Sequence, residues 1–218
     1  MKVRRILLAT VAGVGLLTAA PPAQAAGAAA VTATATPPDQ CSEADWHGDA
    51  RLGPERLPVV GRVGQQLIDY QRTGGRPEQE FLAAFYDSSA GSWKYPPADG
   101  YVILNGKPIK VVQTLKPGLD IDRYGSEFGS FLAPEGLAYA KRSIPPQSLD
   151  NLAAPGGCNY HDYKVLKPFK VQAGPIAPWF NQPGWGWQYQ LDATLVPGAP
   201  ARINVGWLVT NGYLERLV

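Results

Sequence analysis

Residues 119–134 read Leu-Asp-Ile-Asp-Arg-Tyr-Gly-Ser-Glu-Phe-Gly-Ser-Phe-Leu-Ala-Pro, a segment that joins an acid–arginine–aromatic group to two glycines and a closing proline. Glycine permits positive φ and a close approach of the backbone to a ligand. The guanidinium of Arg123 can hold a phosphate or a carboxylate at two points. The segment therefore predicts an anion-binding loop with an aromatic neighbour. Pairing of Arg123 with Asp120 or Asp122 is the alternative.

The N-terminal residues 1–25 read as a secretory signal peptide. Three basic residues within the first five positions precede the apolar stretch 6–20, and Ala-Gln-Ala at 23–25 fits a small-x-small cleavage site. We therefore expect a secreted, extracellular protein with no membrane association after cleavage. A retained N-terminal anchor is the alternative. Residues 26–40 are small and proline-rich, which predicts a disordered linker.

The charge balance argues against a nucleic-acid partner. The whole chain has 20 basic and 18 acidic residues. Removal of Lys2, Arg4 and Arg5 with the signal peptide leaves 17 basic against 18 acidic residues. A near-neutral mature chain lacks the basic surface that attracts DNA or RNA, so we expect no nucleic-acid partner.

Two cysteines, Cys41 and Cys158, are expected to form a disulfide, because the chain is predicted to enter an oxidising compartment. A catalytic thiol, with His161 three positions from Cys158, is the alternative. Two cysteines and two widely separated histidines have no spacing typical of metal ligands, so no metal site is expected.

The hydrophobic pattern predicts an α+β fold, with N-terminal helices packed beside a twisted, mostly antiparallel sheet system. We expect an N-terminal helical region over residues 41–92 and a sheet domain over residues 93–218. The predicted helices are 54–71 and 77–88, and the predicted strands are 101–104 and 107–115 around an Asn-Gly turn, 160–171 with a break at Pro168, 188–195 and 203–209.

Five short motifs follow one another between residues 93 and 217. They are Asp122-Arg123-Tyr124-Gly125, Phe131-Leu132-Ala133-Pro134, Arg142-Ser143-Ile144-Pro145-Pro146, Gly174-Pro175-Ile176-Ala177-Pro178 and Gln182-Pro183-Gly184. Together they resemble the tuberculosis necrotizing toxin (TNT) family of NAD glycohydrolases. The resemblance implies an ADP-ribosyltransferase-like fold for residues 93–218. It also implies cleavage of the nicotinamide–ribose N-glycosidic bond to give nicotinamide and ADP-ribose. NAD or NADP is then the substrate, and no cofactor is expected.

The resemblance also assigns the site. It gives catalytic roles to Arg123, Tyr124 and Gln188, and by a looser match to His161. The substrate-binding residues that we expect are Arg142, Phe131, Trp185 and Trp187. The two tryptophans depart from the glycine run that is usual in the family, and they either stack on nicotinamide or adenine or narrow the pocket.

The chemistry of NAD hydrolysis is compatible with these residues. Nicotinamide leaves as a neutral ring, so the general acid of a two-carboxylate glycosidase is dispensable. Positioning and electrostatics then supply the rate. We expect Arg123 and Arg142 to hold the pyrophosphate, Tyr124 to flank nicotinamide, and Gln188 to bind the ribose hydroxyls or orient water.

Several alternatives stay open. Arg142 can satisfy carbonyls at a turn, Gln188 can bond backbone, and His161 can be structural, while Glu127 either stabilises the cationic sugar or caps its loop. ADP-ribosyl transfer to an acceptor and non-enzymatic carbohydrate binding are the competing functions. For residues 54–88 three roles are open: bracing the core, covering the site, or forming a homodimer interface. A proteinaceous inhibitor is a further expected partner.

Overall fold

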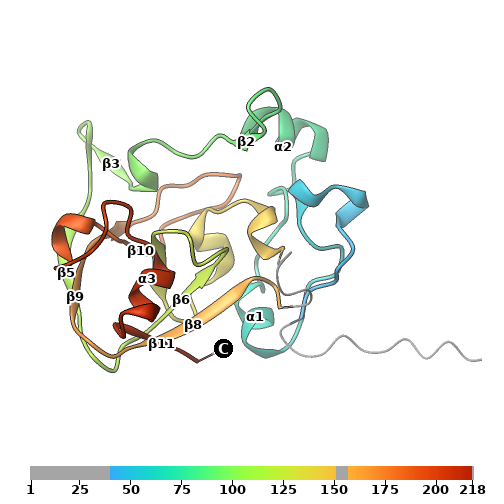
Figure 1. Ribbon diagram of the computed structural model, residues 1–218. Helices are drawn as coiled ribbons and strands as arrows, with labels where there is room; N and C mark the ends of the chain where they lie inside the picture. Colours follow the sequence, from blue (N-terminus) through green and yellow to red (C-terminus); the bar gives the residue numbers. More distant parts are fainter. Residues whose placement is uncertain (1–39, 151–156, 218) are drawn as a thin grey trace, which may run out of the picture. The chain divides into compact units, whose positions relative to one another are not determined.

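The computed structural model describes residues 40–150 and 157–217. The expected signal peptide and the linker up to residue 39 lie outside the described residues. The described part has the α+β organisation that the sequence predicts, with short helices beside a large curled antiparallel sheet (Figure 1). None of the helices in this part is long and apolar enough to cross a bilayer.

Seven strands form the main sheet, in the order β11-β8-β6-β7-β10-β9-β5, and each strand is antiparallel to its neighbours. In the centre of the sheet, Asp122 faces Ala133 on one side and Asp162 on the other. The strands are β5 (Val111–Leu115), β6 (Asp120–Tyr124), β7 (Phe131–Pro134), β8 (Tyr160–Val165), β9 (Phe169–Pro175), β10 (Trp187–Gln190) and β11 (Leu214–Arg216).

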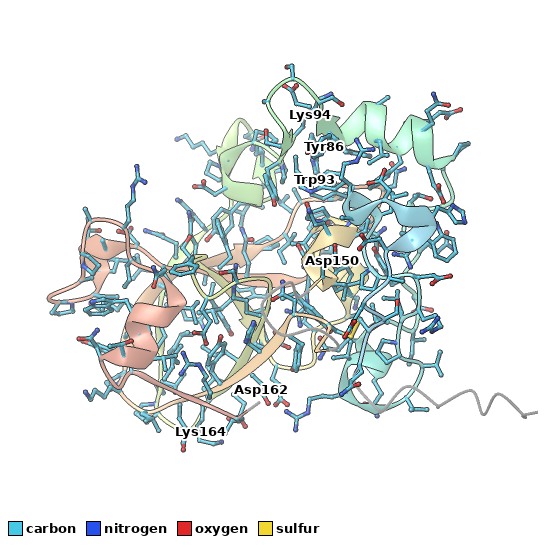
Figure 2. The ribbon with its side chains drawn as sticks, turned by 45° about the vertical axis from the view of Figure 1, so that its right-hand side comes forward. Tyr86, Trp93, Lys94, Asp150, Asp162 and Lys164 are labelled. Atoms are coloured by element: carbon cyan, nitrogen blue, oxygen red, sulfur yellow. A yellow bond between two sulfur atoms is a disulfide. The ribbon has the colours of Figure 1, made fainter. Side chains whose placement is uncertain are left out.

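Two further strand pairs lie outside the main sheet. Strands β3 (Ile103–Leu104) and β4 (Lys107–Pro108) form a hairpin whose Asn105 and Gly106 both have positive φ, as a type I′ turn requires. This hairpin confirms the Asn-Gly turn at the predicted place. The second pair, β1 (Tyr86–Asp87) and β2 (Ser92–Trp93), brings Trp93 edge-on against Tyr86 (Figure 2).

The N-terminal helices are shorter than the sequence pattern suggests. Helix α1 covers only Gly61–Gln66, because the chain before it contains Pro58 and Val60 is extended with φ −131°. Helix α2 (Glu78–Phe85) starts beside Pro77 as predicted, and ends three residues before the expected stop. The prediction of a continuous helix over 54–71 was therefore wrong. Short 3-10 helices make up the remainder: η1 (Trp46–Gly48), η2 (Ala50–Leu52), η3 (Ala98–Gly100), η4 (Tyr139–Arg142), η5 (Pro146–Leu149) and η6 (Ala193–Leu195).

Two predicted strands near the C-terminus are also corrected. Strand β10 stops at Gln190 because the Asp192 side chain accepts a hydrogen bond from the Thr194 backbone and starts η6. Residues 203–209 do not form a strand: α3 (Val205–Thr210) begins where Asn204 accepts a hydrogen bond from the Trp207 backbone at 2.8 Å.

Residues 41–92 and 93–217 share hydrophobic cores. One core combines Val63 and Leu67 near α1 with Tyr124 and Tyr139 from the sheet side. A second core joins Leu52 and Phe81 to Trp93 and Phe180. Backbone carbonyls of Gln71 and Thr73 also accept hydrogen bonds from Gln182 and Asn181. The N-terminal region therefore packs as part of the same folded body.

The predicted disulfide between Cys41 and Cys158 is present. Both cysteines are buried, and the bond spans 117 positions of sequence. A cross-link over so long a segment restricts the unfolded chain strongly, so it fastens the start of the fold to the region just before β8.

We expect the double substitution Cys41→Ser and Cys158→Ser to lower the free energy of unfolding by about 2–5 kcal/mol, because the unfolded chain regains the entropy of the open loop. Urea denaturation of oxidised wild type and the variant measures the difference. Equal midpoints would contradict the prediction, and reduced wild type should match the variant.

Asp150 is a half-buried carboxyl at the end of η5 (Figure 2). Burial raises its pKa to about 7, the nearby Asp45 carboxylate adds to the rise, and Arg72 opposes it. Its Oδ2 has no hydrogen-bond partner among the described residues. The folded protein therefore holds a carboxyl that resists ionisation near neutral pH.

The raised pKa predicts that the stability contribution of Asp150 falls as pH rises from about 4 to about 7, because the unfolded carboxyl ionises first. Asp150→Asn removes this titration. We expect the variant to melt about 2–4 °C above wild type at pH 8 and to lose that advantage towards pH 4. Calorimetric melting across this range measures the gap, and a pH-independent gap would contradict the assignment.

Candidate active site

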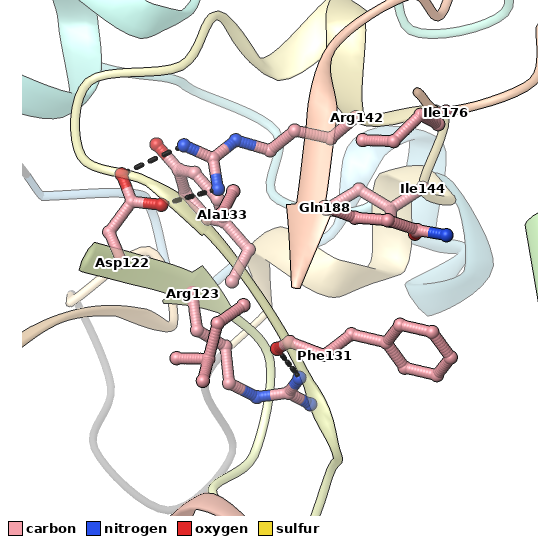
Figure 3. A pocket seen from close by; sticks show the side chains of 10 residues that line it. Asp122, Arg123, Phe131, Ala133, Arg142, Ile144, Ile176 and Gln188 are labelled. Atoms are coloured by element: carbon pink, nitrogen blue, oxygen red, sulfur yellow. Dashed lines mark hydrogen bonds and ion pairs between the residues drawn. The ribbon is translucent and has the colours of Figure 1, made fainter. Parts of the chain in front are cut away.

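A small pocket, with a cavity volume of about 70 Å³, opens where β6 and β7 meet the start of β10 and the segment after η4 (Figure 3). Five of the eight predicted site residues line it. The lining residues are Asp122, Arg123, Tyr124, Phe131, Leu132, Ala133, Arg142, Ile144, Ile176 and Gln188. Residues from four of the five sequence motifs thus meet around one cavity.

Arg123 is a half-buried cation held by backbone oxygens. Its Nε donates to the carbonyls of Gly125 and Ser126, and its Nη1 donates to the Phe131 carbonyl at 2.7 Å. No carboxylate in the described part of the chain lies within ion-pair distance of it. Burial lowers its pKa, as expected for a cation withdrawn from water, but the guanidinium stays protonated. The alternative of pairing with Asp120 or Asp122 does not hold.

The loop after β6 folds around this guanidinium. A Cβ at Gly129 would lie 2.0 Å from Arg123 Nη2, so any larger residue there would displace this guanidinium. Gly125 has φ +100°, which side-chain-bearing residues rarely adopt. The glycines of this loop were expected to let the backbone approach a ligand closely. In the structure the backbone approaches the Arg123 side chain instead.

Arg142 is engaged inside the protein. It is 6% exposed and makes a bidentate ion pair with Asp122, whose Oδ1 and Oδ2 lie 2.6 and 2.8 Å from Nη1 and Nη2 (Figure 3). Nε and Nη2 also donate to the Leu137 carbonyl. Nη2 donates further to Gln66 Oε1 at 3.0 Å. The expected pyrophosphate contact through this guanidinium would have to break the pair, so Arg142 contributes its stem to the pocket wall.

Tyr124 supplies an aromatic wall beside this pair. Its ring is 5% exposed and packs edge-on against Tyr139, with centroids 4.9 Å apart. The Arg142 guanidinium carbon lies 5.0 Å from the centre of the Tyr124 ring, on its face. The position of Tyr124 is therefore coupled to the position of Arg142.

Gln188 lies at the opposite side of the pocket from the ion pair, with its amide towards the Phe131 side (Figure 3). The side chain is 8% exposed, and Nε2 donates to the Asp99 carbonyl at 3.0 Å. Asp99 has φ +56° and belongs to η3, so an unusual turn provides the acceptor. This side-chain bond fixes the orientation of the amide. It is separate from the backbone hydrogen bonds that pair β10 with its neighbouring strands.

Three predicted site residues do not line the pocket. His161 lies on β8 opposite Arg123, and burial lowers its pKa. Trp185 is 65% exposed, and Trp187 is 37% exposed. Glu127 forms an ion pair with Arg216 and accepts a hydrogen bond from Tyr163, so its carboxylate is already engaged.

Sequence reasoning missed five of the lining residues and also Gln66. The five lining residues stand within the quoted motifs, so the motifs themselves contained the signal: they are Asp122, Leu132, Ala133, Ile144 and Ile176. Gln66 comes from α1, and no pattern in the sequence connects it to Arg142, 76 positions away.

A second, larger pocket is lined in part by residues of β9 and β10. It holds Gln172 and Gln190, which face each other across β9 and β10, and Gln190 is also the register partner of Phe131. Lys110 and Arg202 line it as well, and neither makes an ion pair within the described residues. Across residues 40–150 and 157–217, no group of three His, Cys, Asp or Glu side chains is arranged to hold a metal ion.

Comparison with known proteins defines the class. The sequence model of the family described as tuberculosis necrotizing toxin matches residues 114–217. The conidial surface nicotinamide adenine dinucleotide glycohydrolase nadA of Aspergillus fumigatus is 40% identical over 189 residues, which cover 83% of this chain and 76% of that protein. The chain belongs to the tuberculosis necrotizing toxin family.

A solved structure of tuberculosis necrotizing toxin complexed with its immunity factor aligns with 78% of this chain and 79% of that chain. The TM-score is 0.48 at 20% sequence identity.

The buried pair predicts a strong effect of Arg142→Met. This change leaves Asp122 without its cation, and we expect it to lower the free energy of unfolding by about 3–5 kcal/mol. Adding Asp122→Asn should recover part of that loss, because the uncompensated charge is gone. Denaturant unfolding of the single and double variants measures both effects. A single variant as stable as wild type would contradict the buried pair.

Proposed function

We propose that the chain is a secreted NAD glycohydrolase whose active site is the pocket that contains Arg123, Tyr124 and Gln188. The observation that carries this proposal is Arg123, a half-buried cation without a carboxylate partner among the described residues, at the edge of a pocket with aromatic and amide walls. Such a site suits a ligand that combines negative charge with a flat ring. The 40% identity to an NAD glycohydrolase supports the same substrate.

The size of the two pockets suggests how a dinucleotide lies. The first pocket has a cavity volume of about 70 Å³, well below the range of about 300–1,000 Å³ that is typical of ligand pockets, so it can take only one end of a dinucleotide. It suits the nicotinamide ribose, with Tyr124 and Phe131 as ring contacts. The pyrophosphate then passes Arg123, and the adenosine half extends into the open second pocket beside Gln190. Lys110 and Arg202 there are suited to the extra phosphate of NADP.

Catalysis in this arrangement is mainly positional. As the N-glycosidic bond breaks, positive charge develops on the ribose and nicotinamide leaves as a neutral ring. The Gln188 amide, fixed by its bond to the Asp99 carbonyl, holds the ribose hydroxyls or the attacking water. A preorganised polar group that needs no movement during the reaction lowers the barrier effectively.

The cellular setting proposed here is extracellular. The disulfide and the sequence of residues 1–25 support export, and the Aspergillus relative is a conidial surface protein by name. A proteinaceous inhibitor is a further proposed partner, by comparison with the toxin that was solved with its immunity factor. NAD is the substrate in this scheme, and the protein supplies all groups that contact it.

We expect Gln188→Ala to lower kcat/KM for etheno-NAD by about 100-fold or more, because a preorganised polar contact to the reacting centre is lost. Fluorescence of the released etheno-ADP-ribose follows turnover. Gln65→Ala, which removes an exposed glutamine from α1, is the control and should retain wild-type activity.

Chromatography of the products with labelled NAD completes the test. Free nicotinamide and free ADP-ribose in equal amounts are expected, whereas label retained on an acceptor would indicate transfer. Wild-type turnover by Gln188→Ala would contradict the role of this amide, and a wild-type protein that leaves NAD intact would overturn the proposed function.

A further inference from the structure

Helix α1 reaches the buried side of the candidate active site. Gln66, its last residue, is 4% exposed, and Oε1 accepts a hydrogen bond from Arg142 Nη2 at 3.0 Å. The other partners of that guanidinium, Asp122 and the Leu137 carbonyl, belong to the sheet and its loops. Gln66 is thus the contribution of the N-terminal helical region to this cluster.

We propose that Gln66 is a positioning residue of the active site, which fixes Arg142 and through it the Tyr124 ring, so that α1 is a functional part of the catalytic unit. This inference rests on the proposed function for its kinetic consequences. It assigns a role to a segment that lies entirely before residues 114–217, where the family match is found.

The balance of donors and acceptors explains why Gln66 matters. Asp122 accepts from both terminal nitrogens of Arg142, and its Oδ2 also accepts from the Gly136 backbone and the Tyr160 hydroxyl. The carboxylate is therefore fully used. Gln66 supplies a further neutral acceptor to Nη2, whose two hydrogens are shared among Asp122 Oδ2, the Leu137 carbonyl and Gln66 Oε1, and so adds to the contacts that fix the guanidinium.

The geometry of Gln66 makes its Oε1 the functional atom. Oε1 is the atom of Gln66 that accepts from the Arg142 guanidinium. Nε2 is buried, and no acceptor among the described residues meets full hydrogen-bond geometry with it. The Gln66 side chain nevertheless interacts with the Tyr160 hydroxyl, where its hydrogen bonding acts to lower the pKa of that tyrosine against the effect of burial.

Helix α1 is itself held rigidly enough to act as a support. Arg62, one turn before Gln66, makes an ion pair with Asp162 on β8, and Asp162 is the register partner of Asp122. Val63, between them, is fully buried in the core that contains Tyr124 and Tyr139. The helix is therefore held to β8 through Arg62, near its start, and to η4 through Gln66, at its end.

The consequence reaches the pocket through Tyr124. Because the Arg142 guanidinium lies over the Tyr124 ring, a guanidinium that turns away releases one face of that ring. Tyr124 and the Arg142 stem both line the pocket. Loss of the Gln66 oxygen should therefore alter the geometry in which the substrate reacts.

The test compares Gln66→Met, which keeps the side-chain length and removes the acceptor, with Gln65→Met on the exposed face of the same helix. We expect Gln66→Met to lower kcat for etheno-NAD by about ten-fold and to change KM less than about three-fold, because misplaced positioning groups lower the rate. Gln65→Met should keep wild-type kcat and KM. Gln66→Glu retains an acceptor oxygen and should fall between wild type and Gln66→Met.

Circular dichroism at the assay temperature gives the folded fraction of each variant. If the fall in kcat is no larger than the fall in the folded fraction, the role of Gln66 is only structural, and the inference is overturned. Wild-type kcat and KM in Gln66→Met would overturn it as well.

A second measurement does not depend on turnover. Nitrogen-15 NMR follows exchange of the Arg142 Nε proton, which is bonded to the Leu137 carbonyl. Exchange should accelerate several-fold in Gln66→Met and stay at the wild-type rate in Gln65→Met. Unchanged exchange in both would overturn the inference, whereas absence of nicotinamide release from wild type would overturn only the proposed function.

Discussion

The buried ion pair between Arg142 and Asp122 is the interaction on which the rest of the site depends. A buried charge is costly unless it is paired and hydrogen-bonded, and here both partners are satisfied without solvent. The pair joins η4 to the centre of the sheet, and Tyr160 donates to its carboxylate. Its geometry sets the pocket wall, since the Arg142 guanidinium lies over the Tyr124 ring and both residues line the pocket.

Arg123 presents the opposite situation in the same motif. Adjacent residues of β6 point to opposite faces of the sheet, so Asp122 turns to Arg142 while Arg123 turns into the loop that follows. Three backbone carbonyls partly replace the water that its guanidinium has lost. Carbonyl dipoles solvate a cation without neutralising it, so its positive charge remains available to an anionic ligand.

Local chemistry explains which parts of the fold were predictable. The Asn105-Gly106 hairpin and the start of α2 depend on neighbouring residues, and both appear where the sequence places them. Strand β10 ends early and α3 replaces a strand because the Asp192 and Asn204 side chains capture nearby backbone N–H groups. These side-chain hydrogen bonds compete with strand pairing, and an alternating pattern of apolar residues gives no information about that competition.

The candidate site was predictable to the extent that its motifs are continuous in sequence. Five predicted residues line one pocket because β6, β7, η4 and β10 bring them together. The partners of Arg142 could not be read in the same way. An arginine in a sequence gives no sign of whether its donors face a ligand or an internal carboxylate. Gln66, contributed by a helix of six residues, has a role only through a contact made after folding.

The bond between Cys41 and Cys158 links the anchorage of this N-terminal region to the redox state of its surroundings. Thiols stay reduced in the cytosol and are oxidised outside it, so the cross-link is complete only where the environment removes electrons. Export, as proposed above, would place the chain where this bond can form. The change of compartment would then complete the maturation of the fold.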